Sequence, residues 1–157
     1  MIKLLFLKIE KTLVKQEIFT FIFFSFLLLI LLAVPFHLVK YFFDISSGNS
    51  IMVEKTIIEK VIIGIFIGPI IETLIFQTAL INLSLFIKKN KLFAILVSAL
   101  LFGLSHYYSF YYFTYTFTIG SFLSYLYFLS KKKKYNPILT LSSIHALYNL
   151  IVLATNL

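Results

Sequence analysis

The chain has 157 residues, of which 61% are hydrophobic and 13% are charged, and its mean hydropathy is +1.00. Soluble domains average about 45–50% apolar and about 25% charged residues, so this composition excludes an ordinary soluble domain and indicates a single-domain membrane protein. The absence of cysteine excludes disulfide bonds and thiolate chemistry. All fourteen basic residues are lysines, and the net charge is +8.

Five apolar segments are suited to cross a bilayer as helices, which takes about 20 residues each. In chain order they cover about residues 18–39, 57–87, 92–112, 113–130 and 137–155. We expect Pro35 to kink the end of the first helix. The second contains Gly64, Gly68 and Pro69, so we expect it to be bent or to start late, at Val61. The sequence therefore predicts an all-α fold, a polytopic transmembrane helix bundle with about five spans.

The lysines lie between the apolar segments and divide unequally between the two sides of the membrane. With the N-terminus in the cytoplasm, the inner segments hold eleven lysines and the outer segments three, as the positive-inside rule requires. The first apolar run is too long for a cleaved signal peptide and lacks a small-residue cleavage site. We therefore expect a multi-pass protein of the cell (inner) membrane with a cytoplasmic N-terminus. Lysines that flank membrane helices indicate contact with the lipid bilayer and no nucleic-acid partner.

Three of the predicted spans carry ionisable side chains in their apolar interior, namely Glu72, His106 and His145. An ionisable group inside a bilayer costs roughly 2.5–3.5 kcal/mol on insertion scales, so such groups usually face the bundle interior and mark function. Asn149 lies four residues after His145 and shares its helix face. Thr73 and Gln77 form a second pair with this spacing, next to Glu72.

Together these groups meet the requirements for hydrolysing an amide with water. Glu72 can take a proton from water, His106 can share that proton or orient the water, and a second histidine with an asparagine can stabilise a developing oxyanion. The same atoms could instead ligate zinc, so the metal stays unknown. Each polar residue also has a structural alternative, a hydrogen bond to a neighbouring helix. We expect that structural role for His37, near the end of the first span.

The order and spacing of these residues resemble a known family. The segments 72–77, 102–106 and 145–149 read Glu-x-x-x-Phe-Gln, Phe-x-x-x-His and His-x-x-x-Asn. This set resembles the CPBP family, the CAAX-protease and bacteriocin-processing membrane proteins related to the Rce1-type prenyl-protein endopeptidase. The first family motif usually reads Glu-Glu-x-x-x-Arg, so Thr73 and Gln77 replace its second glutamate and its arginine. Replacing both keeps the local charge balance and still permits a hydrogen bond.

The resemblance implies an intramembrane endopeptidase that cuts a peptide or a membrane-associated protein. By this resemblance, Glu72 and His106 would activate water, while His145 and Asn149 would stabilise the oxyanion. Family members have been described both as metalloproteases and as metal-independent glutamate-type enzymes, so zinc is one option for a cofactor. We favour the metal-free mechanism, because three zinc ligands would come from three separate helices without a His-x-x-x-His pair.

The chain is expected to form one structural domain with two parts. Residues 1–60 would supply an N-terminal anchor span and its connecting loop, and residues 61–157 the catalytic bundle. Two other functions stay open, a non-catalytic membrane immunity or binding protein on the same scaffold and a small transport-like protein. The lack of a visible internal repeat disfavours transport. The sequence predicts neither the oligomeric state nor the identity of the substrate.

Overall fold

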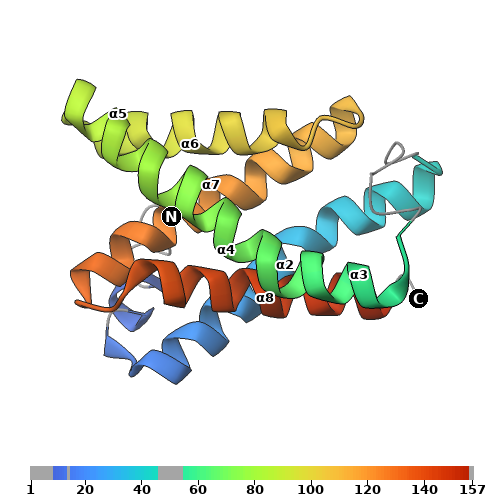
Figure 1. Ribbon diagram of the computed structural model, residues 1–157, viewed down its shortest axis with the longest axis horizontal. Coiled ribbons are helices and arrows are strands. Elements are labelled where there is room, and N and C mark those ends of the chain that lie inside the picture. The colour runs from blue at the N-terminus through green and yellow to red at the C-terminus, as the bar shows by residue number, and fades with distance from the viewer. Residues whose placement is uncertain (1–8, 14, 46–54, 156–157) are drawn as a thin grey trace.

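The structure, a computed structural model, describes residues 9–13, 15–45 and 55–155. Within these ranges every regular element is helical, and the helices pack as a bundle (Figure 1). The uninterrupted α-helices are α2 (Ile18–Phe43), α6 (Lys91–Ser105), α7 (Phe110–Lys132) and α8 (Pro137–Thr155). This arrangement confirms the predicted all-α helix bundle.

The helix over Ile57–Ile87 is continuous but alternates between α and π segments. These are α3 (Ile57–Val61), η1 (Ile62–Ile67), α4 (Gly68–Glu72), η2 (Thr73–Leu80) and α5 (Ile81–Ile87). The helix begins at Ile57 because Thr56 and Glu59 form a capping box in front of it. The segment η1 ends directly before Gly68 and Pro69. In an α-helix the proline ring clashes with the carbonyl four residues earlier, and the wider π turn leaves room for it.

Three helices are long and apolar enough to cross a membrane, namely α2, the helix over Ile57–Ile87, and α8. The 23-residue helix α7 is less apolar, since it carries many Tyr, Thr and Ser residues. The apolar helix α6 has only 15 residues. At 1.5 Å per residue it is about 22 Å long, shorter than the roughly 30 Å hydrocarbon core. The end of α6 therefore lies within the thickness of the bundle.

Two predicted helix boundaries differ from the structure. The third span was expected to continue to Tyr112, but α6 ends at Ser105 and α7 begins at Phe110. The break follows from capping, since the Ser109 side chain accepts the N–H of Tyr112 and starts α7. The first helix continues past its predicted end to Phe43.

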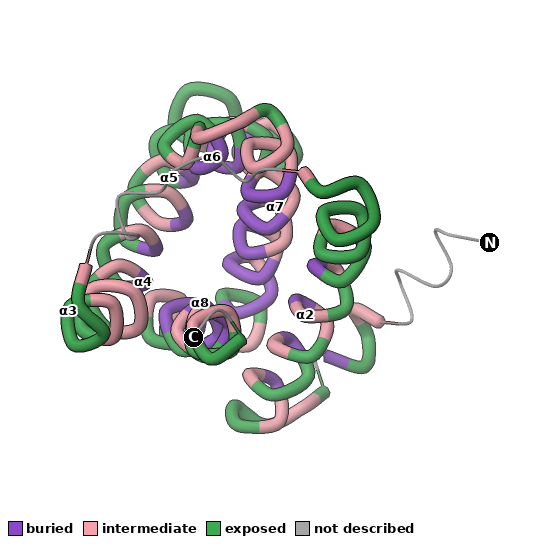
Figure 2. Tube along the Cα trace, turned by 90° about the vertical axis from the view of Figure 1, so that its right-hand side faces the viewer, coloured by how far each residue is buried: buried purple, intermediate pink, exposed green. Residues whose placement is uncertain are grey.

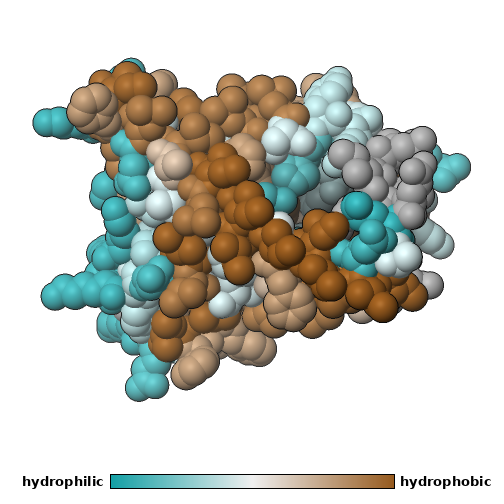
Figure 3. Space-filling model, viewed as in Figure 1, coloured by the Kyte–Doolittle hydropathy of each residue, from teal (hydrophilic) through white to brown (hydrophobic). Residues whose placement is uncertain are grey.

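Helix α7 forms the centre of the bundle. Figure 2 shows its buried residues between α2, α6 and α8. Ile119 and Leu123 of α7 belong to one apolar core with Leu29 of α2 and Ile144 of α8. Most large apolar side chains on the outside of the other helices are exposed, and an apolar belt crosses the face in Figure 3. Such a belt is expected of a surface that faces lipid.

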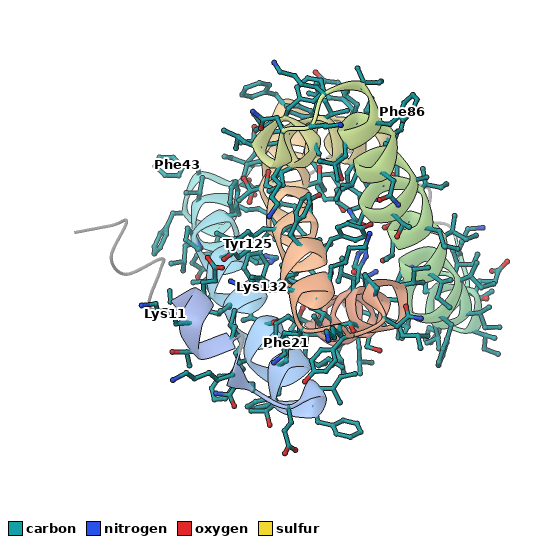
Figure 4. All side chains as sticks on the ribbon, turned by 90° about the vertical axis from the view of Figure 1, so that its left-hand side faces the viewer. Lys11, Phe21, Phe43, Phe86, Tyr125 and Lys132 are labelled. Carbon is teal, nitrogen blue, oxygen red and sulfur yellow. The ribbon has the colours of Figure 1, made fainter. Side chains whose placement is uncertain are left out.

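The lysine clusters and the N-terminal segment lie at the same end of the bundle. The Nζ atom of Lys132 is 3.1 Å from Oε1 of Glu10, and the Lys133 ammonium donates to the Gln16 carbonyl. This end is the hydrophilic left edge of Figure 3, and Figure 4 looks onto it with Lys11 and Lys132 labelled. The N-terminal segment and residues 131–134 were predicted to lie on the same side of the membrane, and these contacts agree with that prediction.

Candidate active site

Glu72 lies midway along the helix over Ile57–Ile87, where α4 meets η2. Its side chain is 26% exposed, so the carboxylate is partly buried and partly open to solvent. Gly68 lies one turn earlier, where a Cβ would clash with the Ile63 carbonyl oxygen at 2.8 Å and would lie at an ordinary contact distance of 3.6 Å from Glu72 Oε1. The helix that carries the carboxylate therefore has no room for a larger residue at Gly68.

Two imidazoles from separate helices face the Glu72 carboxylate. The Nε2 atom of His106 is 3.7 Å from Oε1, and the Nε2 atom of His145 is 3.6 Å from Oε2. Both separations are longer than a direct hydrogen bond, which spans about 2.7–3.2 Å. They fit a site that tightens when substrate binds, or one water that contacts both atoms from the side. The structure thus brings together all three ionisable residues that the sequence placed in different spans.

The protonation of His106 follows from its neighbours. His106 caps α6, and its Nδ1 lies 2.9 Å from the Phe102 carbonyl and 3.0 Å from Ser105 Oγ. The Ser105 hydroxyl donates to the same carbonyl at 2.8 Å, so Nδ1 has only acceptors within reach and must carry a hydrogen. In the neutral form of the ring, Nε2 is then bare and faces Glu72. A bare nitrogen and a carboxylate are both acceptors, so one water beside the pair can donate to each.

Phe102 packs against both imidazoles. Its ring centroid is 4.6 Å from that of His106 and 6.0 Å from that of His145. Gly120 of α7 leaves room for the Phe102 ring, because a Cβ at residue 120 would lie 2.7 Å from Phe102 Cδ1. The motif in the sequence contains Phe102, but nothing in the sequence pairs it with Gly120 or identifies Ser105 as a partner of His106.

Asn149 does not join the carboxylate and the imidazoles. Its Nδ2 donates to the Gly64 carbonyl at 2.7 Å. On the same face of α8, the Ser142 hydroxyl donates to the Pro69 carbonyl at 3.3 Å. His37 also lies outside the group, since it is exposed and its ring packs edge-on against Tyr115.

The supporting pair Thr73 and Gln77 is fully buried. The hydrogen bond that their spacing permits is not formed. Thr73 Oγ1 and both polar atoms of the Gln77 side chain have no partner among the described residues. The Nδ1 atom of His145 is buried without a partner in the same part of the structure. These atoms make the interior next to Glu72 polar but unsatisfied by protein groups, which is unusual for buried polar atoms.

The donor types around Glu72, two imidazoles and one carboxylate, would suit zinc. Among the described residues, no group of three His, Cys, Asp or Glu side chains is placed so that it could hold a metal ion. The chemistry below is therefore derived from side chains alone.

The fold and the site together indicate a class of protein. A multi-pass helical bundle that holds a carboxylate, midway along the helix over Ile57–Ile87, between two imidazoles has the groups of a water-activating membrane enzyme. The family model described as type II CAAX prenyl endopeptidase Rce1-like matches residues 54–151, more than half of the chain. The chain belongs to this Rce1-like family, and the matched region contains Glu72, His106, His145 and Asn149. Neither a curated protein nor a solved structure matches the chain.

Proposed function

We propose that the protein is an intramembrane endopeptidase, which hydrolyses a peptide bond of a peptide or a membrane-associated protein. The observation that carries the proposal is the position of the Glu72 carboxylate, with His106 Nε2 3.7 Å from one oxygen and His145 Nε2 3.6 Å from the other. Family membership supports the same reaction class. The N-terminus and the lysine-rich end would face the cytoplasm, in agreement with the lysine count.

The reaction begins with a water that donates hydrogen bonds to Glu72 and His106. Glu72 removes a proton while the water oxygen attacks the carbonyl carbon of the scissile peptide bond. The resulting oxyanion accepts a hydrogen bond from His145 Nε2–H, which in the resting site points to Glu72. Glu72 then passes its proton to the departing amine, the C–N bond breaks, and the carboxylate is regenerated. No metal ion is required for any of these steps.

The surroundings of the site support this assignment of roles. His106 is held by the Phe102 carbonyl and Ser105, which orients Nε2 of the neutral ring as an acceptor for the water. His145 is only 6% exposed, which shields the oxyanion from bulk water and strengthens its hydrogen bond. Glu72, at 26% exposure, keeps a path by which water and an extended peptide can reach it.

The test is a comparison of membrane proteomes from cells that express the wild type or Glu72→Gln. We expect at least one precursor to accumulate uncut with Glu72→Gln and to be processed in the wild type. The matched control is Glu17→Gln, which makes the same chemical change at an exposed residue without a side-chain capping bond. A wild-type phenotype of the cells that express Glu72→Gln would contradict the proposal and favour a non-catalytic binding or immunity protein.

A further inference from the structure

Pro69 leaves one carbonyl of the Glu72 helix without a partner along the helix. The carbonyl of Gly64 would bond the N–H of residue 68 in an α-helix, or that of residue 69 in a π-helix. The N–H of Gly68 donates to Ile63 instead, at the end of η1. Pro69 has no N–H to offer. Neither of the usual helical donors therefore reaches the Gly64 oxygen.

Asn149 supplies the missing donor from a different helix. Its Nδ2 lies 2.7 Å from the Gly64 oxygen, a short and well-formed hydrogen bond. Ser142 bonds the carbonyl of Pro69 itself at 3.3 Å, and this contact is buried. Ser142, His145 and Asn149 follow a spacing of three and four residues, so they form one stripe on α8. The outer two members of this stripe contact the backbone around Pro69, and His145 between them faces Glu72.

We infer that Asn149 is a positioning residue, which fixes the Glu72 helix against α8 by satisfying the carbonyl that Pro69 leaves open. With that bond in place, Glu72 Oε2 comes within 3.6 Å of His145 Nε2. This role differs from the oxyanion contact that the family resemblance implies for Asn149. The bond and its dependence on Pro69 stand without the proposed function, and only the consequence for catalysis rests on it.

The experiment is a double-mutant cycle between Asn149 and Pro69 on the full chain in detergent micelles. Pro69→Ala restores an N–H that can donate to the Gly64 carbonyl. Asn149→Ala alone should lower the Tm by about 3–8 °C, because it leaves a part-buried carbonyl unpaired. In the Pro69→Ala background the same change should lower the Tm by less than half as much. Equal losses in the two backgrounds would overturn the inference.

Asn82→Ala is the matched control. Its Oδ1 accepts a hydrogen bond from Tyr127 at 2.9 Å, so it is another amide that joins the Ile57–Ile87 helix to a neighbour. Nothing connects this bond to Pro69, so the effects of Asn82→Ala and Pro69→Ala should add. A coupling for Asn82 as large as that for Asn149 would show a general softening of the helix and would count against the inference.

A spectroscopic measurement covers the case in which Pro69→Ala does not fold. Gly64–Ile65 is the only Gly–Ile pair in the sequence, so 13C-carbonyl glycine with 15N isoleucine isolates one NMR signal. Asn149→Ala should move the Gly64 carbonyl signal upfield, as expected when a carbonyl loses a hydrogen bond, while Asn82→Ala should leave it in place. An unchanged signal in Asn149→Ala would overturn the inference.

The two roles for Asn149 predict different activities. If Asn149 positions the helix, Asn149→Ala should slow processing of the precursor, and adding Pro69→Ala should restore part of the rate. An oxyanion donor would not be rescued by an N–H at position 69, so a double variant as slow as Asn149→Ala would overturn the positioning role. Failure of the proposed function itself would appear separately, as normal biological function of Glu72→Gln.

Discussion

Gly120→Ala should disturb the site through Phe102, without changing any polar residue. A Cβ at Gly120 would lie 2.7 Å from Phe102 Cδ1 and 3.2 Å from its Cβ and Cγ. Carbon atoms in contact are normally about 3.5–4.0 Å apart, so the ring must move by about 1 Å. Phe102 is only 2% exposed and is bounded by both imidazoles, so this movement displaces them.

The magnitude follows from two opposing effects. Overpacking a core costs about 1–3 kcal/mol, whereas replacing Gly by Ala within a helix gains about 1 kcal/mol. We therefore expect the free energy of unfolding to fall by about 1 kcal/mol, which lowers the Tm by about 2–4 °C for a chain of this size. A misplacement of about 1 Å can slow catalysis by about 100-fold, so activity should suffer more than stability.

The assay measures thermal unfolding of the purified protein and the rate at which the precursor is processed. Gly103→Ala is the control, because its Cβ would meet Phe113 and Phe117 at 3.1–3.2 Å rather than Phe102. It should keep a processing rate near that of the wild type. If Gly120→Ala also cut the precursor at the wild-type rate, the packing of Phe102 would not be what holds the two histidines, and the reasoning would be refuted.

Three further predictions concern the metal, the buried pair and the membrane orientation. Chelators should leave processing intact if Glu72 and His106 activate water directly, as proposed; stoichiometric metal that is lost together with activity and restores it on return would contradict this. The double change Thr73→Val with Gln77→Leu should leave the Tm unchanged or raise it. Both side chains are fully buried, and their polar atoms have no partner among the described residues. A fall in Tm of more than about 5 °C would show that these atoms have partners. A cysteine at position 132, in place of Lys132, should resist labelling by an impermeant reagent added to intact cells; efficient labelling from outside would reverse the orientation.

The sequence alone was sufficient to predict the fold class and the three ionisable residues of the site. Long apolar segments separated by lysines have few alternatives to membrane helices, since the bilayer leaves no other way to satisfy the backbone. Glu72, His106 and His145 are conspicuous for the same reason, because each is too costly to keep in an apolar helix without a use. Their convergence could be predicted from this cost, although they lie on three different helices.

The tertiary structure decided the partner of each polar group. The sequence could not show that Asn149 bonds the Gly64 carbonyl, since helical periodicity assigns it a face of α8 but not the atom opposite. It also permitted a hydrogen bond between Thr73 and Gln77 that the structure does not contain. The early end of α6 likewise depends on a cap and on the packing around Phe102. Local pattern determines which helices form and which faces are polar, whereas hydrogen-bond partners depend on how separate helices are placed within a few tenths of an ångström.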